Sequence, residues 1–411
     1  IFMPKSSLSS VISAKKLYAG SDPLSGVLRD LPDAVLMIGA DGDIFYANPA
    51  AEKLFGFARR ESETNLQPEH CDFALAAQIV TEEIVILMAK EAKRLTGSDN
   101  ICLAGGVALN CVANGKLQNA KIFKNVYIQP AAGDAGGALG AALVGEYIYF
   151  GQERKVDINA IDSMKGSYLG PEFSDVDTRL MAKRYNAVYT HYENFEQLAA
   201  KTATDLADGN VVGWFQGRME FGPRALGGRS ILGDARNEEM QKKLNLKIKY
   251  REGFRPFAPS VLAEDATEYF ELEGNSPYML LVHNVQEKRR KPLPENYRAL
   301  PLMEKLYYLR SDLPSITHID FSARIQTVHQ ETNPRYWTLI NEFKKQTGYG
   351  LVVNTSFNVR GEPIVCTPED AYKCLMRTEM DFLVVGNFIF DKKDQPEWAE
   401  KDDWKDEFKL D

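Results

Sequence analysis

Helical and strand patterns alternate at short range along the chain, and this alternation limits the folds it can adopt. Apolar residues recur at helical spacing over residues 73–88, and Gly97 stands where such a helix would end. A short apolar strand is expected at 101–104, followed by a helix, a second strand at 126–129 and a helix rich in glycine and alanine. Such an order predicts an α/β layer with a parallel or mixed sheet.

The alternation continues after a polar segment. Residues 152–166 hold no strong periodicity, so we expect a domain boundary there. Beyond it, strands are expected at 211–215, 351–353 and 382–385. A chain of 411 residues is long enough for two or three domains, each with its own core.

The start of the chain has a different pattern. Residues 1–20 are expected to be a linker or disordered. A strand at 31–38, a tight turn at Asp41-Gly42 and a returning strand at 44–47 predict a β-hairpin. This stretch resembles the first half of a PAS sensory domain, so residues 21–64 are assigned as a PAS-like fragment. The later strands of such a domain are not recognisable downstream.

Composition argues against several classes of protein. No apolar run reaches the roughly 18 residues that a membrane-spanning helix needs. The start shows no signal-peptide pattern, and the five cysteines show neither CxxC pairing nor metal-ligand spacing. We therefore expect a cytoplasmic protein with free thiols and no membrane partner.

The charge is unevenly distributed. A formal net charge of −8 makes nucleic acid an improbable partner. Residues 218–255, however, hold ten Lys or Arg against five Asp or Glu. A small anionic ligand would explain this local excess, and a solvated helix face is the alternative.

Two glycine-rich loops each join a predicted strand to a helix. The first, LAGGVALN at 103–110, contains Gly105 and Gly106, and the second, PAAGDAGGA at 130–138, contains Asp134. Glycine lets a backbone approach a ligand closely, and a helix N-terminus offers free N–H groups to a phosphate. A strand-to-helix turn also needs glycine for structural reasons alone. Asp134 could bind a metal or cap the helix, and its position favours the cap.

Four further segments combine cations with glycine, proline or small polar side chains. The segment 214–230 (WFQGRMEFGPRALGGRS) places three arginines among four glycines, and 249–259 (KYREGFRPFAP) interleaves cations with aromatic residues. The segments 322–326 (SARIQ) and 354–363 (NTSFNVRGEP) follow. A phosphate-binding enzyme loop and a groove for single-stranded nucleic acid both have this composition.

These segments occur in the same order in the C-terminal domain of the carbamoyltransferase family that acts on nodulation factors and antibiotics, and residues 166–390 resemble that domain. The string at 354–363 also resembles the YrdC-type carbamoyl-adenylate fold. The two glycine loops resemble the second lobe of the actin-like ATPase fold, assigned to 65–151. The fold class implied is α/β (α+β), a partial actin-like lobe followed by a YrdC-like domain, with 391–411 as an acidic tail.

The resemblance implies an ATP-dependent O-carbamoyltransferase. Such an enzyme forms carbamoyl adenylate from carbamoyl phosphate and passes the carbamoyl group to a small-molecule hydroxyl. Its cofactors would be ATP with Mg²⁺ and a divalent metal, iron in the family, with Asp134 as one ligand. The residues expected around the phosphate and carbamoyl oxygens are Arg224, Lys249, Arg255 and Arg324. The residues expected against the nucleotide or carbamoyl group are Gly105, Gly106, Asn110, Ser356 and Asn358, with Arg229 and Arg251 in either supporting or structural roles.

One part of the family pattern is missing. The first actin-like lobe should precede residue 65 and carry two histidines at helical spacing, but no two of the five histidines are three or four residues apart. The metal site is therefore expected to be incomplete. Three explanations stay open: a truncated or spliced reading frame, favoured by the start at Ile1; a partner chain that supplies the lobe; or a sensory fusion that regulates activation alone.

Two other functions are alternatives. A PAS-linked sensor would bind a carbamoyl or phosphate compound without turning it over. A tRNA-modifying enzyme of the YrdC type would need a broad basic surface, which the acidic charge disfavours.

Overall fold

The computed structural model describes residues 36–38, 44–47, 64, 66–155 and 162–398. The chain divides after Val80 into two compact units. In the first unit, β1 (Leu36–Ile38) pairs antiparallel with β2 (Ile44–Ala47), with Met37 opposite Tyr46. The hairpin predicted from the sequence is thus confirmed.

The rest of the PAS-like assignment falls outside the described residues. This applies to the turn at Asp41-Gly42, and the linker assigned to 1–20 also lies outside them. Most of the tail assigned to 391–411 also lies outside, since the description ends at residue 398.

A small parallel sheet opens the second unit. Its strands are β3 (Asn100–Leu103) and β4 (Asn125–Ile128), and Ile101 lies opposite Val126. The helix α4 (Cys111–Asn119) connects them, and α5 (Gly136–Val144) follows β4. The division between the units falls within the long helix α3 (Pro68–Thr96), which ends where Gly97 adopts a φ of +64° and donates its N–H to the carbonyl of Lys93. These elements confirm the alternation predicted from the sequence.

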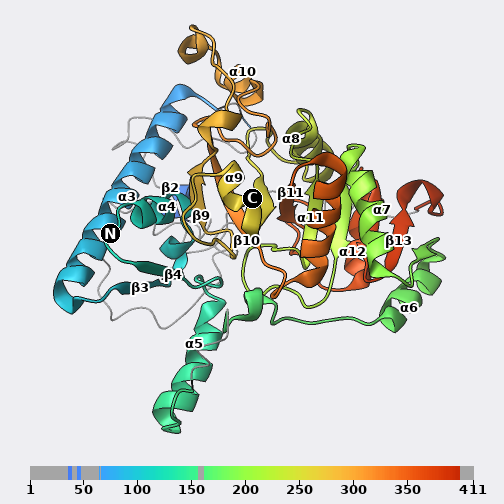
Figure 1. Cartoon of the computed structure of the whole chain (residues 1–411), viewed down its shortest axis with the longest axis horizontal. Helices are drawn as coiled ribbons and strands as arrows, with labels where there is room; N and C mark the ends of the chain where they lie inside the picture. Colours follow the sequence, from blue (N-terminus) through green and yellow to red (C-terminus); the bar gives the residue numbers. More distant parts are fainter. Residues whose placement is uncertain (1–35, 39–43, 48–63, 65, 156–161, 399–411) are drawn as a thin grey trace. The chain divides into compact units, whose positions relative to one another are not determined.

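A nine-stranded mixed sheet forms the larger part of the second unit (Figure 1). Its strands are β5 (Thr190–His191), β6 (Val212–Phe215), β7 (Arg229–Gly233), β8 (Ala258–Leu262), β9 (Leu281–Asn284), β10 (Ser322–Val328), β11 (Leu351–Ser356), β12 (Phe382–Val385) and β13 (Phe388–Asp391). The order across the sheet is β5-β13-β12-β6-β7-β11-β8-β10-β9. Two pairs, β8 with β10 and β6 with β12, run parallel, and the other pairs run antiparallel.

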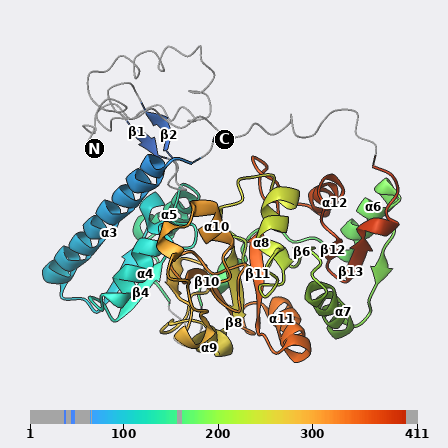
Figure 2. The same ribbon diagram turned by 90° about the horizontal axis from the view of Figure 1, so that it is seen from above.

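Helices cover both faces of this sheet. They are α6 (Asp175–Tyr185), α7 (Phe195–Ala207), α8 (Met240–Lys243), α9 (Ala266–Tyr269), α10 (Leu302–Tyr307), α11 (Pro334–Thr347) and α12 (Pro368–Arg377). Figure 2 shows α7 and α11 on one side and α8, α12 and α6 on the other. Side chains alternate accordingly, since Trp214 of β6 packs among residues of α7 and α11 while Phe215 packs on the opposite face.

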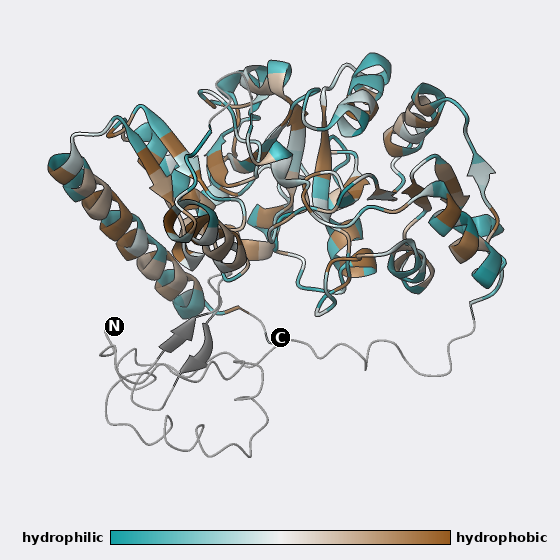
Figure 3. Ribbon diagram, turned by 90° about the horizontal axis from the view of Figure 1, so that it is seen from below, coloured by the Kyte–Doolittle hydropathy of each residue, from teal (hydrophilic) through white to brown (hydrophobic). Residues whose placement is uncertain are grey.

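Burial on both faces explains the uninterrupted apolar runs that predicted these strands. Every residue of β6 and β8 is buried, and the hydrophobic residues coloured brown in Figure 3 gather on the strands and along the helices that pack on them. No helix in the described part of the chain combines the length and the apolar composition that a membrane crossing requires.

Candidate functional site

The loop at residues 221–228, which carries Arg224, is folded around the buried carboxylate of Glu220. Oε1 of Glu220 accepts the backbone N–H groups of Leu226 at 2.6 Å and Gly228 at 2.7 Å, and that of Arg229 at 3.4 Å. Hydrogen bonds to a charged acceptor are stronger than those between neutral groups. Glu220 therefore fixes the backbone from which Arg224 projects. Nothing in the sequence indicated that Glu220, which lies within a glycine-rich string, would hold this loop.

Side chains of the large sheet hold the same loop from the other side. Asn354 Nδ2 of β11 donates to the carbonyl of Ala225 at 3.0 Å, and Gln326 Nε2 of β10 donates to that of Leu226 at 2.7 Å. Asn354 also donates to Oε1 of Gln326, at 2.9 Å. Both amide side chains are buried, so the loop is tied to two central strands.

Lys249, Ser356 and Asn358, three of the residues named from the sequence, lie in direct contact. Lys249 Nζ donates to Oδ1 of Asn358 at 2.7 Å, to its carbonyl at 2.9 Å and to the Ser356 hydroxyl at 3.2 Å, and it also contacts the Ser356 carbonyl. The Ser356 hydroxyl donates to Oδ1 of Asn358 at 2.7 Å. Burial, followed by the positive charge of Arg251, lowers the pKa of Lys249 well below its ordinary value.

Arg251, whose charge acts on this lysine, lies near three further arginines, and the four form an arginine cluster. Burial lowers the pKa of Arg251 to about 10, and the charges of Arg255, Arg324 and Arg360 push it in the same direction. Glu252 lies 3.3 Å from Nε of Arg255 and partly balances the charge. The buried Nε of Arg324 meets no hydrogen-bond acceptor among the described residues. The cluster therefore has positive charge and donor capacity available for an anion.

Arg251 had been named from the sequence as a site residue, whereas Arg360 had not. Arg251 Nε donates to Oδ1 of Asn245 at 2.8 Å, and its guanidinium lies 5.1 Å from the ring of Phe257, so its own contacts are internal. Arg360 was not singled out from the sequence, although it is the cation of the NTSFNVRGEP string. The only signal for it was membership of that string.

Arg229 has a structural environment. Its guanidinium is fully buried and donates to the carbonyls of Gln216, Gly217 and Gly228 at 2.8 to 3.1 Å, and to that of Pro171 at 3.2 Å. It stacks 3.5 Å from the ring centre of Phe215, and burial lowers its pKa to about 10. These contacts favour the structural role that the sequence left open for it.

The glycine loops lie against each other and against the loop of Arg224. The N–H of Gly105 donates to the carbonyl of Ala132 at 2.8 Å, and Gly105 has a φ of +97° that favours glycine. A side chain at Gly222 would approach the carbonyl of Pro130 to 2.8 Å, so this close contact also requires glycine.

Gly106 and Asn110 have different surroundings. A Cβ at Gly106 would meet nothing within 4 Å, so packing does not explain the glycine there. Asn110 caps α4, because its Oδ1 accepts the N–H of Ala113 at 3.0 Å.

Asp134 does not cap α5. The cap residue of that helix is Ala135, no side chain caps it, and Asp134 is exposed. The preference for a capping role was therefore wrong, because the helix begins two residues after Asp134 and not one. Among the described residues no three His, Cys, Asp or Glu side chains lie close enough together to hold a metal ion. A single exposed carboxylate does not fit the divalent metal that the resemblance implies.

Comparison with known proteins identifies two matching family models. The carbamoyltransferase N-terminus model matches residues 40–143, and the carbamoyltransferase C-terminus model matches residues 203–392. The first match begins inside the segment assigned as PAS-like, so that assignment stays a prediction.

Relatives match most of this chain. The uncharacterized protein sll1178 of Synechocystis is 57% identical over 87% of this chain and 58% of its own length. The nodulation protein NolO of Bradyrhizobium diazoefficiens is 39% identical over 79% of this chain and 55% of its own. The 3'-hydroxymethylcephem-O-carbamoyltransferase of Streptomyces clavuligerus is 31% identical, with coverages of 84% and 58%. The chain thus spans a little over half the length of these relatives.

A solved structure, full-length HypF in the phosphate- and nucleotide-bound form, aligns with a TM-score of 0.29. The alignment has 16% identity and covers 62% of this chain and 34% of that one, and no argument rests on it.

Proposed function

The chain belongs to the carbamoyltransferase family, and from this premise we propose that it activates a carbamoyl group with ATP and passes it to the hydroxyl of a small molecule. In the activation step, carbamoyl phosphate loses phosphate to water, the carbamate oxygen attacks the α-phosphorus of ATP, and pyrophosphate leaves. In the transfer step, the acceptor hydroxyl attacks the carbamoyl carbon of carbamoyl adenylate, gives up its proton, and AMP leaves.

The arginine cluster beside Lys249 is the observation that carries this proposal. Carbamoyl phosphate and ATP are both anions, and bringing them together costs free energy unless cations offset the repulsion. Arg255, Arg324 and Arg360 lie close enough to Arg251 for their positive charges to lower its pKa. An anionic ligand would relieve that repulsion, so the free site is arranged for such a ligand before it binds.

Individual roles follow from the contacts of each residue. Arg224, Arg255 and Arg324 would bind phosphate and carbamoyl oxygens. Lys249 holds Ser356 and Asn358 at the end of β11, where both would reach ATP or the carbamoyl group. Arg251 would support the cluster through its charge.

The glycine loops would approach the nucleotide. Gly106 stands in open space and Gly105 ties its loop to Ala132, so a ligand could approach the backbone closely there. Asn110 would act by capping the helix that begins beside that ligand. We assign no step to a metal ion, because the described residues do not form a site for one.

The acceptor is proposed to be a small molecule with a hydroxyl group. One relative is named for acting on a 3'-hydroxymethylcephem, which carries such a group. The sensor alternative is not favoured, because carbamoyltransferase models match 40–143 and 203–392. We propose a cytoplasmic setting for this chemistry.

Mass spectrometry of the quenched reaction tests the proposal. Carbamoyl adenylate should form from ATP and carbamoyl phosphate with the wild-type chain, and Arg324→Ala should reduce it at least about tenfold, the effect of losing one charged hydrogen bond. The exposed arginine control, Arg298→Ala, should match the wild type. Equal product from Arg324→Ala and wild type would overturn the assignment of the site.

A further inference from the structure

The side chain of Asn114 joins the first glycine loop to the edge of the large sheet. Asn114 lies in α4 and is buried, with 1% of its surface exposed. Its Nδ2 donates to the carbonyl of Ala108 at 2.8 Å, in the short turn Gly106–Leu109. The same nitrogen donates to the carbonyl of Leu280, the residue directly before β9, at 3.1 Å. Both hydrogens of the amide group are therefore used, one on each side.

The helix α4 lies directly against the backbone of β9, and a glycine permits this contact. A Cβ atom on Gly115 would overlap the carbonyl oxygen of Val282. Gly115 is buried within α4, and glycine in a helix interior costs stability relative to alanine. Helix formation therefore does not explain the glycine, whereas the close approach to β9 does.

The backbone that leads to the Leu280 carbonyl has an unfavourable conformation. Met279 is buried and has a φ of +57°, in the left-handed region that residues other than glycine rarely adopt. Such a residue persists only where the surrounding structure holds it, and such residues gather at functional sites. Here the left-handed residue directly precedes the carbonyl that accepts from Asn114.

The strand β9 connects this contact to the arginine cluster. It pairs antiparallel with β10, and Val282 lies opposite Arg324 in the register. The residue whose carbonyl faces Gly115 is thus the neighbour, in the sheet, of an arginine expected to bind phosphate oxygens. The position of α4 and the position of Arg324 are therefore linked through two adjacent strands.

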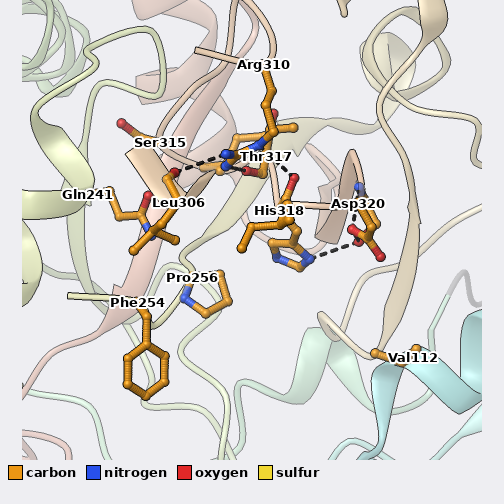
Figure 4. A pocket seen from close by; sticks show the side chains of 13 residues that line it. Val112, Gln241, Phe254, Pro256, Leu306, Arg310, Ser315, Thr317, His318 and Asp320 are labelled. Carbon is orange, nitrogen blue, oxygen red and sulfur yellow. Dashed lines mark hydrogen bonds between the residues drawn. The ribbon is translucent and has the colours of Figure 1, made fainter. Parts of the chain in front are cut away.

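A cavity of about 380 Å³ lies between α4 and the arginine cluster (Figure 4). Val112 of α4 lines it, as do Phe254 and Pro256, which flank Arg255 in the chain. Val112 stands two residues before Asn114 on the same helix. A shift of α4 away from β9 would therefore also change the width of this cavity.

We propose that Asn114 is a positioning residue, which sets the distance between the first glycine loop and the arginine cluster, and that Gly115 lets α4 come close enough to do so. The inference rests on the proposed function, in which the nucleotide meets both the glycine loop and the arginines. A displacement of about 1 Å in groups that hold a substrate can slow its reaction about a hundredfold. Asn114 and Gly115 would act only through the backbones that they contact.

Calorimetric binding of ATP and of inorganic pyrophosphate tests this role. Pyrophosphate needs only the arginine cluster, whereas ATP also needs the glycine loop at the right distance. Asn114→Ala should therefore weaken ATP binding at least about tenfold, the effect of one lost hydrogen bond, and change pyrophosphate binding less than about twofold. Asn119→Ala, at an exposed asparagine of the same helix, is the matched control and should bind both ligands as the wild type does.

Gly115→Ala gives a second test, because it keeps the amide group of Asn114. The added methyl group should push α4 away from β9 and weaken ATP binding at least about tenfold, again with pyrophosphate binding unchanged. Gly140→Ala is the matched control, at an exposed glycine of α5 where a Cβ atom would meet nothing within 4 Å. It should bind both ligands as the wild type does.

The outcomes separate this inference from the proposed function. Equal ATP affinities in the wild type, Asn114→Ala and Gly115→Ala would overturn the positioning role. Parallel weakening of ATP and pyrophosphate in folded variants would also overturn it, because the two residues would then support the fold as a whole. Gly115→Ala decides alone if Asn114→Ala does not fold. Failure of the wild-type chain to bind either ligand would remove the proposed function, and the inference with it.

Discussion

Glu220→Ala should disable the site through the backbone alone. The carboxylate satisfies the buried N–H groups of Leu226 and Gly228 at 2.6 and 2.7 Å. Each buried donor left without an acceptor costs about 1–3 kcal/mol, so the variant should lose roughly 2–6 kcal/mol of unfolding free energy. Arg224 would lose its fixed position, and pyrophosphate release should fall at least about tenfold under conditions where the chain is still folded.

Two further variants make this prediction specific. Glu220→Gln keeps an oxygen acceptor but loses its charge, so it should cost about 1–2 kcal/mol. Glu238→Ala, at an exposed carboxylate, should cost less than about 0.5 kcal/mol. Urea unfolding measures all three. If Glu220→Ala matched Glu238→Ala in both stability and activity, the carboxylate would not hold the loop and the reasoning would fail.

Three other predictions follow from the charges of the site. Asp134→Ala should leave carbamoyl-phosphate-dependent pyrophosphate release unchanged, because its carboxylate is exposed; loss of that release would show that it takes part in activation. Inorganic pyrophosphate should raise the melting temperature of the wild type by occupying the arginine cluster, and less so that of Arg324→Ala, as measured by calorimetry; equal shifts would place the anion elsewhere. Folding lowers the pKa of His318 from 6.5 to about 4. As the pH falls, the unfolded chain therefore binds this proton before the folded chain does. The free energy of unfolding should fall by up to about 3 kcal/mol between pH 6.5 and pH 4. Asp320, Arg324 and Arg310 surround that ring, and urea midpoints that fall equally in His318→Leu would assign the loss to other groups.

Three strands of the large sheet, β6, β11 and β12, were accessible from the sequence because most of their residues are buried. The run VGWF of β6 is apolar at every position, and such a run has few other places in a soluble fold. The hairpin of β1 and β2 was accessible through its Asp-Gly turn signal.

The shape of the site was not accessible in the same way. Asn354 and Ala225 are 129 residues apart and meet only because the sheet brings β11 beside β7 and the loop before it. Arg224 and Arg229 stand five residues apart in one string, yet Arg229 is enclosed by carbonyls. Local sequence does not encode that difference, since the fold supplies the carbonyls.

The capping role predicted for Asp134 depended on the exact residue at which α5 begins. A shift of one residue in the start of α5 makes Ala135 the cap residue and leaves Asp134 exposed. His318 was noted from the sequence only as one of five histidines without helical spacing. Its partner Ser322 lies four residues further on, at the start of β10, directly after the left-handed backbone of Phe321.

Pyrophosphate release from ATP by the purified chain, with and without carbamoyl phosphate, tests the central claim most directly. The account predicts release only when carbamoyl phosphate is present, and its loss in Arg224→Ala with the fold intact. Absence of release from a sample shown to be folded, or release that does not depend on carbamoyl phosphate, would contradict the claim that these residues form a carbamoyl activation site.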